Sequence, residues 1–178
     1  IIHLEATDLV PDDTMQKAGA AEIAAVHEDW FTQDPDRYGP SVRQRLHDTL
    51  QIPLSTVGRV PAWQAAKRAS ARNAFDMVDL LATPMTAVRR KTIGEGTVDI
   101  DGGREPYRPA LWAFSWLVNH LTCPAVALPV PAESGPPSSL QLIAPRWSEH
   151  LLLEVAARLE TVGAVTCPPP PIFFGDWE

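Results

Sequence analysis

Four residues that could contact a ligand recur along one stretch of the chain. Trp112, Trp116, Asn119 and His120 stand at positions i, i+4, i+7 and i+8, so they share one face of a helix. Large aromatic side chains at this spacing are typical of a core, whereas an amide and an imidazole on the same face fit a helix that lines a pocket. The pattern favours core for Trp112 and leaves core and pocket open for Trp116.

The sequence offers two weaker candidates for a nucleophile. Cys123 would react only if its thiol pKa were lowered, and no base is identifiable near it, so a buried structural cysteine is favoured. Ser138 and Ser139 stand at the start of an apolar segment with no Lys or His nearby in sequence. No G-x-S-x-G elbow, P-loop or G-x-G-x-x-G segment occurs. We therefore place no catalytic residue on this chain.

The sequence predicts neither a metal site nor a cofactor. His27 and Glu28 resemble the start of a zinc-binding H-E-x-x-H motif, but Phe31 stands where the second His must be. Zinc-ligand spacing is absent elsewhere. A surface or structural role is favoured for His27.

Two uncharged apolar segments must position the candidate residues. Ala125–Val130 and Ser139–Ala144 are predicted strands, joined by a turn rich in Pro, Gly and Ser. Since neither strand has an alternating polar side, we expect both faces to be buried, as in the centre of an α/β sheet. Val78–Ala82 predicts a further central strand, whose pairing stops at Pro84.

Helices are predicted around these strands by apolar residues that recur every three or four positions. The last of them begins after Ser148, a favourable N-cap, and buries Leu151, Val155 and Leu159. The predicted helices span Met15–Phe31, Ser41–Leu50, Val60–Met77 and Pro109–Leu121, and the last ends near Gly163. An edge strand is predicted at Ile1–Val10, and a loop or small hairpin at Val88–Arg104.

Composition bounds the class of protein. The length and the 45% hydrophobic content fit one globular domain without a second. A net charge of −7 argues against nucleic acid or an anionic membrane as a partner, and no apolar run approaches the ~20 residues that span a bilayer. We expect a cytoplasmic protein with reduced thiols and an extended proline-rich tail at 167–178. The start has no signal peptide and no Met, which suggests a processed or partial chain.

Three segments together carry a resemblance to a known family. They are Val78–Pro84, Asn119–Pro129 and Gly135–Ile143. Their order resembles the D-L-L-x-T-P, N-x-x-G-x-P-A-x-x-x-P and G-x-P-x-G-L-Q-L-I-G segments in the C-terminal part of amidase-signature hydrolases. Glu149 and Glu160 fall where that family has acidic residues in the following helix.

The resemblance implies part of an α/β/α fold with a large mixed β-sheet flanked by helices. It also implies hydrolysis of a carboxylic amide through a Ser–cis-Ser–Lys triad that lies in the N-terminal portion of the family. This sequence contains neither the Gly/Ser-rich segment nor the earlier Lys. The expected partners are therefore that N-terminal portion, as a cleaved part or separate subunit, and a small-molecule amide. A homodimer of the assembled enzyme stays open.

By position in the family, this chain supplies sheet core and part of the substrate pocket. The pocket residues that we infer are Pro84, Met85, Thr86, Trp112, Trp116, Asn119 and Cys123. Thr122, Ser139 and Ala144 replace glycines of the family pattern, and glycine at such places usually permits an unusual backbone angle or a close approach.

Two alternatives follow from the same residues. The first is a non-catalytic scaffold or binding subunit that keeps the fold, and it would lack the Gly/Ser-rich segment and Lys upstream. The second is an independent small α/β domain, which would fold cooperatively as residues 1–178 alone.

Overall fold

The computed structural model describes residues 1, 3, 9, 13–88, 92–132 and 137–166. The proline-rich tail and nearly all of the predicted edge strand at Ile1–Val10 lie outside the described residues. The chain divides into two compact units. The first comprises Ile1–Ala74 with Asn119–Leu121, and the second comprises Phe75–Val118 with Thr122–Glu178.

Helices build the first unit, and the predicted ones are confirmed with small changes at their ends. The longest connection between them holds a short 3-10 helix, which Pro35 begins. The elements are α1 (Asp13–Gln33), η2 (Pro35–Arg37), α2 (Pro40–Leu50), α3 (Leu54–Val57) and α4 (Val60–Phe75). Helix α4 ends two residues before the predicted Met77.

The second unit contains both strands and helices. Its elements are β1 (Leu81–Pro84), β2 (Thr97–Ile100), β3 (Gly103–Pro106), α5 (Tyr107–Trp112), α6 (Ser115–Leu121), β4 (Ala125–Val130), β5 (Ser138–Ile143) and α7 (Glu149–Thr161). The last turn of α6 belongs to the first unit. Strands β2 and β3 form a small hairpin, one of the two forms expected for Val88–Arg104, and it continues two residues beyond that range to Pro106.

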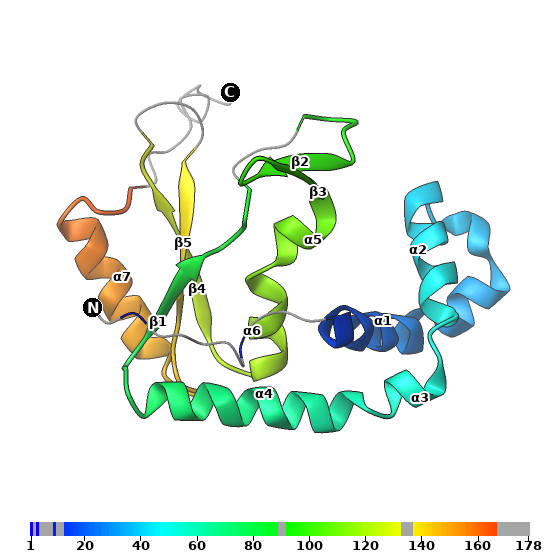
Figure 1. Ribbon diagram of the computed structural model, residues 1–178, viewed down its shortest axis with the longest axis horizontal. Coiled ribbons are helices and arrows are strands. Elements are labelled where there is room, and N and C mark those ends of the chain that lie inside the picture. The colour runs from blue at the N-terminus through cyan, green and yellow to red at the C-terminus, as the bar shows by residue number, and fades with distance from the viewer. Residues whose placement is uncertain (2, 4–8, 10–12, 89–91, 133–136, 167–178) are drawn as a thin grey trace, which may run out of the picture. The chain divides into compact units, whose positions relative to one another are not determined.

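The main sheet is antiparallel, in the order β1-β5-β4 (Figure 1). The α/β class is confirmed, but within the described ranges the strands form only this sheet and the two-stranded hairpin, not a large mixed sheet. The short connection between β4 and β5 explains the antiparallel pairing, since a parallel pair needs a long crossover. Strand β5 is central, and α7 covers one face while α5 and α6 lie on the other (Figure 1).

Strand β1 differs from the prediction in its position and in its place in the sheet. It begins at Leu81, three residues after the predicted start, and it is an outer strand of the described sheet. Pro84 does not end the pairing, because it stands opposite Leu140 and the Met85 N–H still donates to the Ser139 carbonyl at 3.2 Å. In this ladder the Pro84 nitrogen faces away from β5, so its missing N–H costs no hydrogen bond to that strand.

The predicted helix at Pro109–Leu121 is two helices. Helix α5 ends at Trp112, and α6 begins at Ser115 after a turn at Ala113 and Phe114. Side-chain periodicity continues across this turn, so the sequence pattern did not reveal it.

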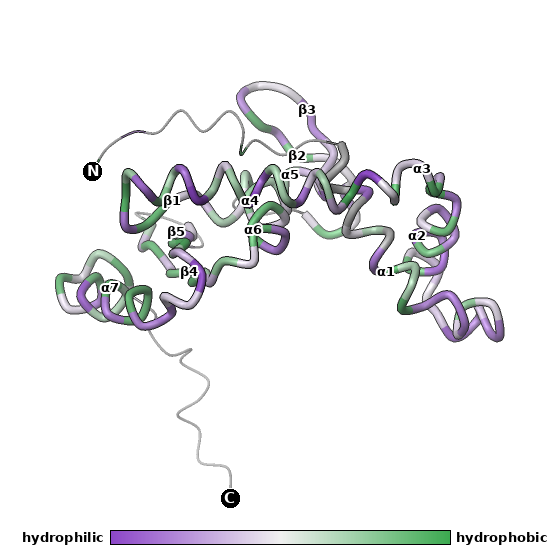
Figure 2. The backbone as a smooth tube through the Cα atoms, turned by 90° about the horizontal axis from the view of Figure 1, so that it is seen from below, coloured by the Kyte–Doolittle hydropathy of each residue, from purple (hydrophilic) through white to green (hydrophobic). Residues whose placement is uncertain are grey.

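The main core lies between the sheet and α7. It is built from Leu128, Leu142, Ala144, Leu152 and Val165. Figure 2 shows the alternation of hydrophobic and hydrophilic residues around α7, and Val155 and Leu159 pack toward this core as predicted. Leu152 is the buried leucine of the helix, whereas Leu151 is half-buried.

Two expectations about this part of the fold are wrong in detail. Ser148 precedes α7, but its side chain makes no capping hydrogen bond. Strand β4 is not buried on both faces, because Ala125 and Ala127 are exposed. No helix in the described part of the chain is long and apolar enough to cross a membrane.

Candidate functional site

The segment after β1 is fixed by hydrogen bonds at several points. The Met85 N–H donates to Ser139, the Thr86 hydroxyl donates to the Val88 carbonyl at 2.6 Å, and the Ala87 N–H donates to the Ala110 carbonyl of α5 at 3.1 Å. Each bond reaches a different element or closes a local turn. The segment is therefore a rigid wall rather than a loose loop.

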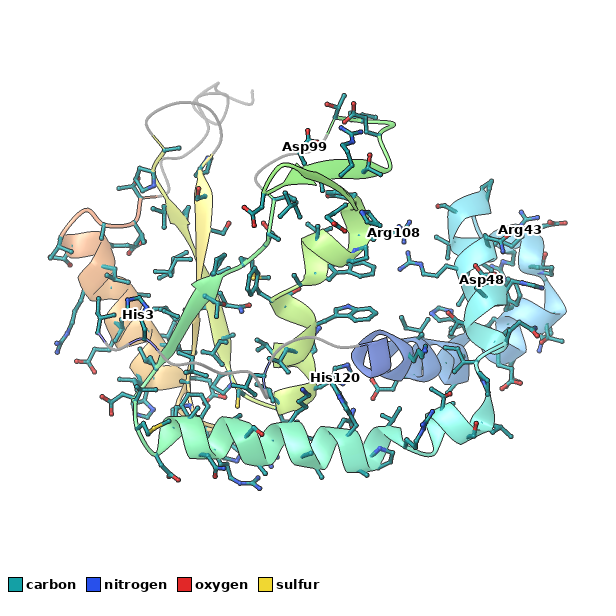
Figure 3. All side chains as sticks on the ribbon, in the orientation of Figure 1. His3, Arg43, Asp48, Asp99, Arg108 and His120 are labelled. Atoms are coloured by element: carbon teal, nitrogen blue, oxygen red, sulfur yellow. The ribbon has the colours of Figure 1, made fainter. Side chains whose placement is uncertain are left out.

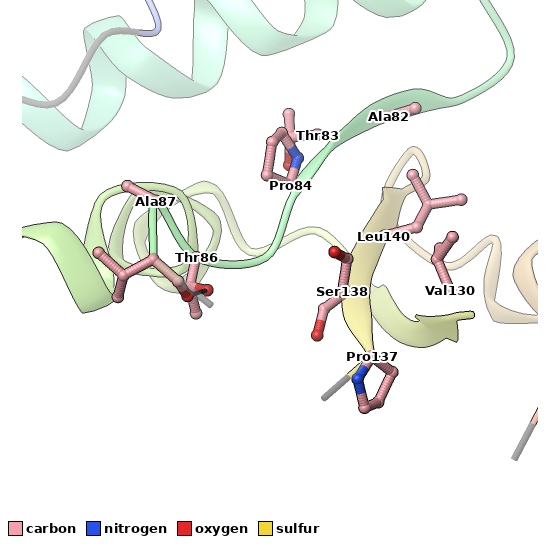
Figure 4. Close-up of a pocket in the computed structure, with 11 residues that line it drawn as sticks. Ala82, Thr83, Pro84, Thr86, Ala87, Val130, Pro137, Ser138 and Leu140 are labelled. Atoms are coloured by element: carbon pink, nitrogen blue, oxygen red, sulfur yellow. Dashed lines mark hydrogen bonds between the residues drawn. The ribbon is translucent and has the colours of Figure 1, made fainter. Parts of the chain in front are cut away.

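A cavity of about 500 Å³ opens beside this wall. Figure 4 shows the 82–87 segment on one side and the beginning of β5 on the other. The lining residues are Ala82, Thr83, Pro84, Thr86, Ala87, Val88, Val130, Pro137, Ser138, Ser139 and Leu140. They carry four hydroxyl groups and no charge. The volume and this mixed lining fit a small uncharged molecule.

Gln141 is a buried polar residue behind the cavity wall. Its exposed fraction is 2%. Its side-chain nitrogen donates to the Thr83 hydroxyl oxygen at 3.1 Å and, at 3.5 Å, approaches the Phe114 carbonyl in the turn between α5 and α6. The amide thus links β1, β5 and the two helices, which satisfies a polar group that would otherwise be costly to bury.

Trp112 and Trp116 lie together across the α5–α6 turn. Their rings are stacked, with centroids 5.1 Å apart and planes inclined by 11°. Both side chains are half-buried. Neither tryptophan lines the 500 Å³ cavity, whereas Pro84 and Thr86 do and Met85 does not.

Asn119 and His120 occupy the last turn of α6, within the first unit. Asn119 is exposed. His120 is 5% exposed, its Nδ1 lies 3.1 Å from the Gln64 side-chain nitrogen, and its carbonyl accepts a bond from Arg68 at 2.9 Å. The Trp63 ring meets its imidazole edge-on, with centroids 5.2 Å apart. These contacts to α4 make His120 (Figure 3) a packed structural histidine.

Cys123 has the properties of a neutral thiol rather than an activated nucleophile. Partial burial raises its pKa above the ordinary thiol value, and the positive charge of Arg146 opposes that shift only in part. Thiolate is the reactive form, so this environment lowers the reactivity of the side chain near neutral pH.

The imidazole of His27 packs against neighbouring aromatic side chains. Its Nδ1 lies 3.1 Å from the Tyr38 hydroxyl, and the rings of Trp30 and Tyr38 meet it edge-on. Among the described residues, no three His, Cys, Asp or Glu side chains are grouped as metal ligands. Nearby in the chain, the Arg43 side chain of α2 donates a hydrogen bond to the Asp36 carboxylate of η2 (Arg43 is labelled in Figure 3).

The three replaced glycines fall at three different kinds of position. Thr122 closes α6 with φ 58° and ψ 32°, in the left-handed region. Ala144 is fully buried and its N–H donates to the Pro124 carbonyl at 3.1 Å. Ser139 lines the cavity. Only Thr122 has the positive φ that favours glycine.

Sequence reasoning did not identify Gln141 as part of the site, nor did it place Thr83 and Val130 at the cavity. Gln141 is a polar residue within an apolar strand segment. Because a buried polar side chain needs a hydrogen-bond partner, this position was the available sign of a role in the site. The serines at the start of β5 reach the cavity beside β1 because β5 pairs with β1, and Val130 reaches it because β4 pairs with β5.

Comparison with known proteins finds a matching family and several relatives. The family model for amidases matches residues 5–153. The chain is 31% identical over 171 residues to the 1-carboxybiuret hydrolase subunit AtzE of Pseudomonas sp. (strain ADP). This match covers 91% of this chain and 37% of the relative. It is 34% identical over 88 residues to the fatty acid amide hydrolase of Oryza sativa subsp. indica, covering 49% of this chain and 14% of the relative.

A solved structure has a similar fold. It is described as an unexpected vestigial protein complex that reveals the evolutionary origins of an s-triazine catabolic enzyme. Its identity is 29% and its TM-score 0.76, and the match covers 83% of this chain and 33% of that chain. The present chain thus spans about a third of the length of AtzE and of the chain in the solved structure.

Proposed function

Because this chain belongs to the amidase family, we propose that it is the C-terminal portion of a serine amidase that hydrolyses the C–N bond of a carboxylic amide. An N-terminal portion carries the Ser–Ser–Lys triad. The present chain supplies sheet core and part of the substrate pocket. A homodimer of the assembled enzyme is compatible with this arrangement.

The open edges of the described sheet support an additional portion. Strands β1 and β4 are its outer strands, and Ala82, Ala125 and Ala127 on them are exposed. Apolar strand edges without neighbours favour association with further strands. In the assembled enzyme these edges extend into the large mixed sheet of the family.

The observation that carries the proposal is the uncharged cavity at the end of β1. Its hydroxyl groups and apolar walls suit the polar yet neutral amide group, and its volume of about 500 Å³ is that of a small-molecule site. The relatives act on different amides, according to their names. We assign an uncharged amide with an apolar or aromatic substituent as the substrate class.

The chemical step takes place on residues that the other portion contributes. A serine attacks the amide carbonyl, while a second serine linked to Lys relays its proton to the leaving amine. Backbone N–H groups stabilise the oxyanion. Of the expected pocket residues, Pro84 and Thr86 line the cavity of this chain and hold the substrate, whereas Met85, Trp112, Trp116, Asn119 and Cys123 do not line it.

Fluorophosphonate labelling followed by intact mass analysis tests this placement of the nucleophile. The probe should modify a serine of the co-purifying or covalently continuous N-terminal portion, and it should leave residues 1–178 unmodified. The variants S138A and S139A should label as well as wild type. Label on Ser138, Ser139 or Cys123 would overturn the placement.

A non-catalytic subunit that keeps the amidase fold is the second candidate. Thr122 favours it, because this position departs from the family's glycine although its φ of 58° is one that glycine adopts more easily. The two candidates differ in the upstream sequence and in activity. A Gly/Ser-rich segment with an earlier Lys, together with turnover of simple amides, supports the enzyme; binding without turnover supports the subunit.

A further inference from the structure

Thr83 lines the cavity and its hydroxyl is bonded to a buried side chain. Its oxygen accepts the Gln141 side-chain bond at 3.1 Å, and Thr83 is also a lining residue of the cavity. Within the described ranges, no acceptor takes the hydroxyl hydrogen of Thr83. A hydroxyl offers one donor and two acceptor positions, so its donor remains available.

The orientation of the Gln141 amide decides which partner donates. The nitrogen and oxygen of such an amide are distinguished by their neighbours. The Phe114 carbonyl can only accept, and the same Gln141 nitrogen contacts both Phe114 and Thr83. The nitrogen therefore faces both groups, and Thr83 must be the acceptor in its bond to Gln141.

We propose that Gln141 holds the Thr83 hydroxyl as a hydrogen-bond donor toward the cavity, where it recognises an acceptor oxygen of the ligand. Thr83 is then a specificity-determining residue and Gln141 its positioning residue. The carbonyl oxygen of an uncharged amide has the required chemistry, so this inference rests on the proposed function for the identity of the ligand.

Burial makes the arrangement rigid. Gln141 is 2% exposed and flanked in β5 by Leu140 and Leu142, so water cannot replace Thr83 as its partner without opening the sheet. The neighbouring Met85–Ser139 bond fixes the same end of β1. A hydroxyl that is held in this way loses little freedom when a ligand binds.

Threonine variants in the full-length protein test the donor. T83V keeps the shape of the side chain and removes the hydroxyl, whereas T83S keeps the hydroxyl. Loss of one neutral hydrogen bond to a ligand should weaken affinity for benzamide and other uncharged amides by about 3- to 10-fold. In an active enzyme this appears as a lower kcat/KM, because the bond to the carbonyl oxygen is present in the bound substrate and strengthens as that oxygen gains negative charge. T83S should restore both values.

Gln141 variants test the positioning role separately from catalysis. Q141M should weaken amide binding in the presence of Thr83 and have little further effect in a T83V background. Q44M, on the exposed α2 surface where Gln44 bonds Asp48, is the matched control. A double-mutant cycle on the free energy of unfolding detects the Gln141–Thr83 bond even without a ligand.

The outcomes separate this inference from the proposed function. Amide binding without hydrolysis by the wild type overturns the proposed enzyme, while the comparison of T83V with T83S still decides the role of Thr83. Equal affinities in T83V and T83S, absence of coupling between positions 83 and 141, or no binding of any tested amide would each overturn the inference.

Discussion

Thr122 closes helix α6 in the left-handed conformation, with φ 58°. This conformation costs an ordinary L-residue roughly 1–2 kcal/mol, and a β-branched side chain makes it worse. The family pattern that the sequence resembles has glycine here, and the observed φ is one that glycine adopts without strain.

Replacing Thr122 with glycine should therefore stabilise the protein. T122G relieves the backbone strain but adds about 0.5–1 kcal/mol of conformational entropy to the unfolded chain, so we expect a net gain of about 0.5 kcal/mol in the free energy of unfolding. T122V is the matched control, because it also removes the hydroxyl but keeps the branched side chain. Urea denaturation in which T122V is as stable as T122G would contradict the strain argument.

Cys123 provides a pH-dependent prediction at the same scale. Because burial raises its pKa in the folded state, the neutral thiol is favoured by folding. Its contribution to stability is fully present below the ordinary thiol pKa of about 8.5 and is lost as the pH rises through the higher folded pKa.

Alkylation kinetics measure this effect directly. In a C167S background, iodoacetamide should modify Cys123 more slowly at pH 8 than it modifies an unstructured cysteine peptide, since less thiolate is present. R146A removes the opposing positive charge, so it should slow the reaction further. Faster alkylation of R146A would show that Arg146 acts by shielding the thiol rather than through its charge.

At the scale of elements, the packing of α7 against the sheet depends more on Leu152 than on the next residue, Leu153. Leu152 is 3% exposed in the core between α7 and the sheet, whereas Leu153 is 66% exposed. L152A should lower the free energy of unfolding by about 3 kcal/mol, because it removes apolar contacts and leaves a cavity. L153A should change it by less than about 0.5 kcal/mol. Similar losses in both variants, measured by denaturation of the assembled protein, would contradict this packing.

Sequence periodicity located most elements but not their interruptions. The prediction for β4 matches its observed bounds, and α1, α2, α4 and α7 appear where apolar residues recur. The α5–α6 turn was missed because local propensity cannot register a contact with a distant strand, and Gln141 approaches the turn from β5. Strand β1 begins later than predicted because its pairing with β5 sets its register.

At the scale of the whole molecule, the outer strands of the described sheet lead to an assembly prediction. Residues 1–178 expressed alone should associate or melt without cooperativity, since Ala82, Ala125 and Ala127 lie on exposed outer strands. Co-expression with the N-terminal amidase portion should give a monodisperse complex with a cooperative transition. Light scattering and calorimetry distinguish these results. A stable, cooperatively melting monomer of 1–178 would favour the independent α/β domain.

The sequence by itself determined the family, the α/β class and the absence of a familiar catalytic motif on this chain. It could do so because these features depend on residue order and local periodicity. It also singled out Thr122 and Pro84 from their places in family segments, and Thr86 from the loop that follows one of them. The family assignment is supported by the match over residues 5–153.

Only the tertiary structure decided how those residues meet. The cavity wall requires β1 and β5 to pair in one register, which places Ser138 and Ser139 beside Pro84 and Thr86. The bond from Gln141 to Thr83 joins residues 58 positions apart. Side-chain chemistry can be read along the chain, but which donor faces which acceptor depends on long-range pairing that no local pattern encodes.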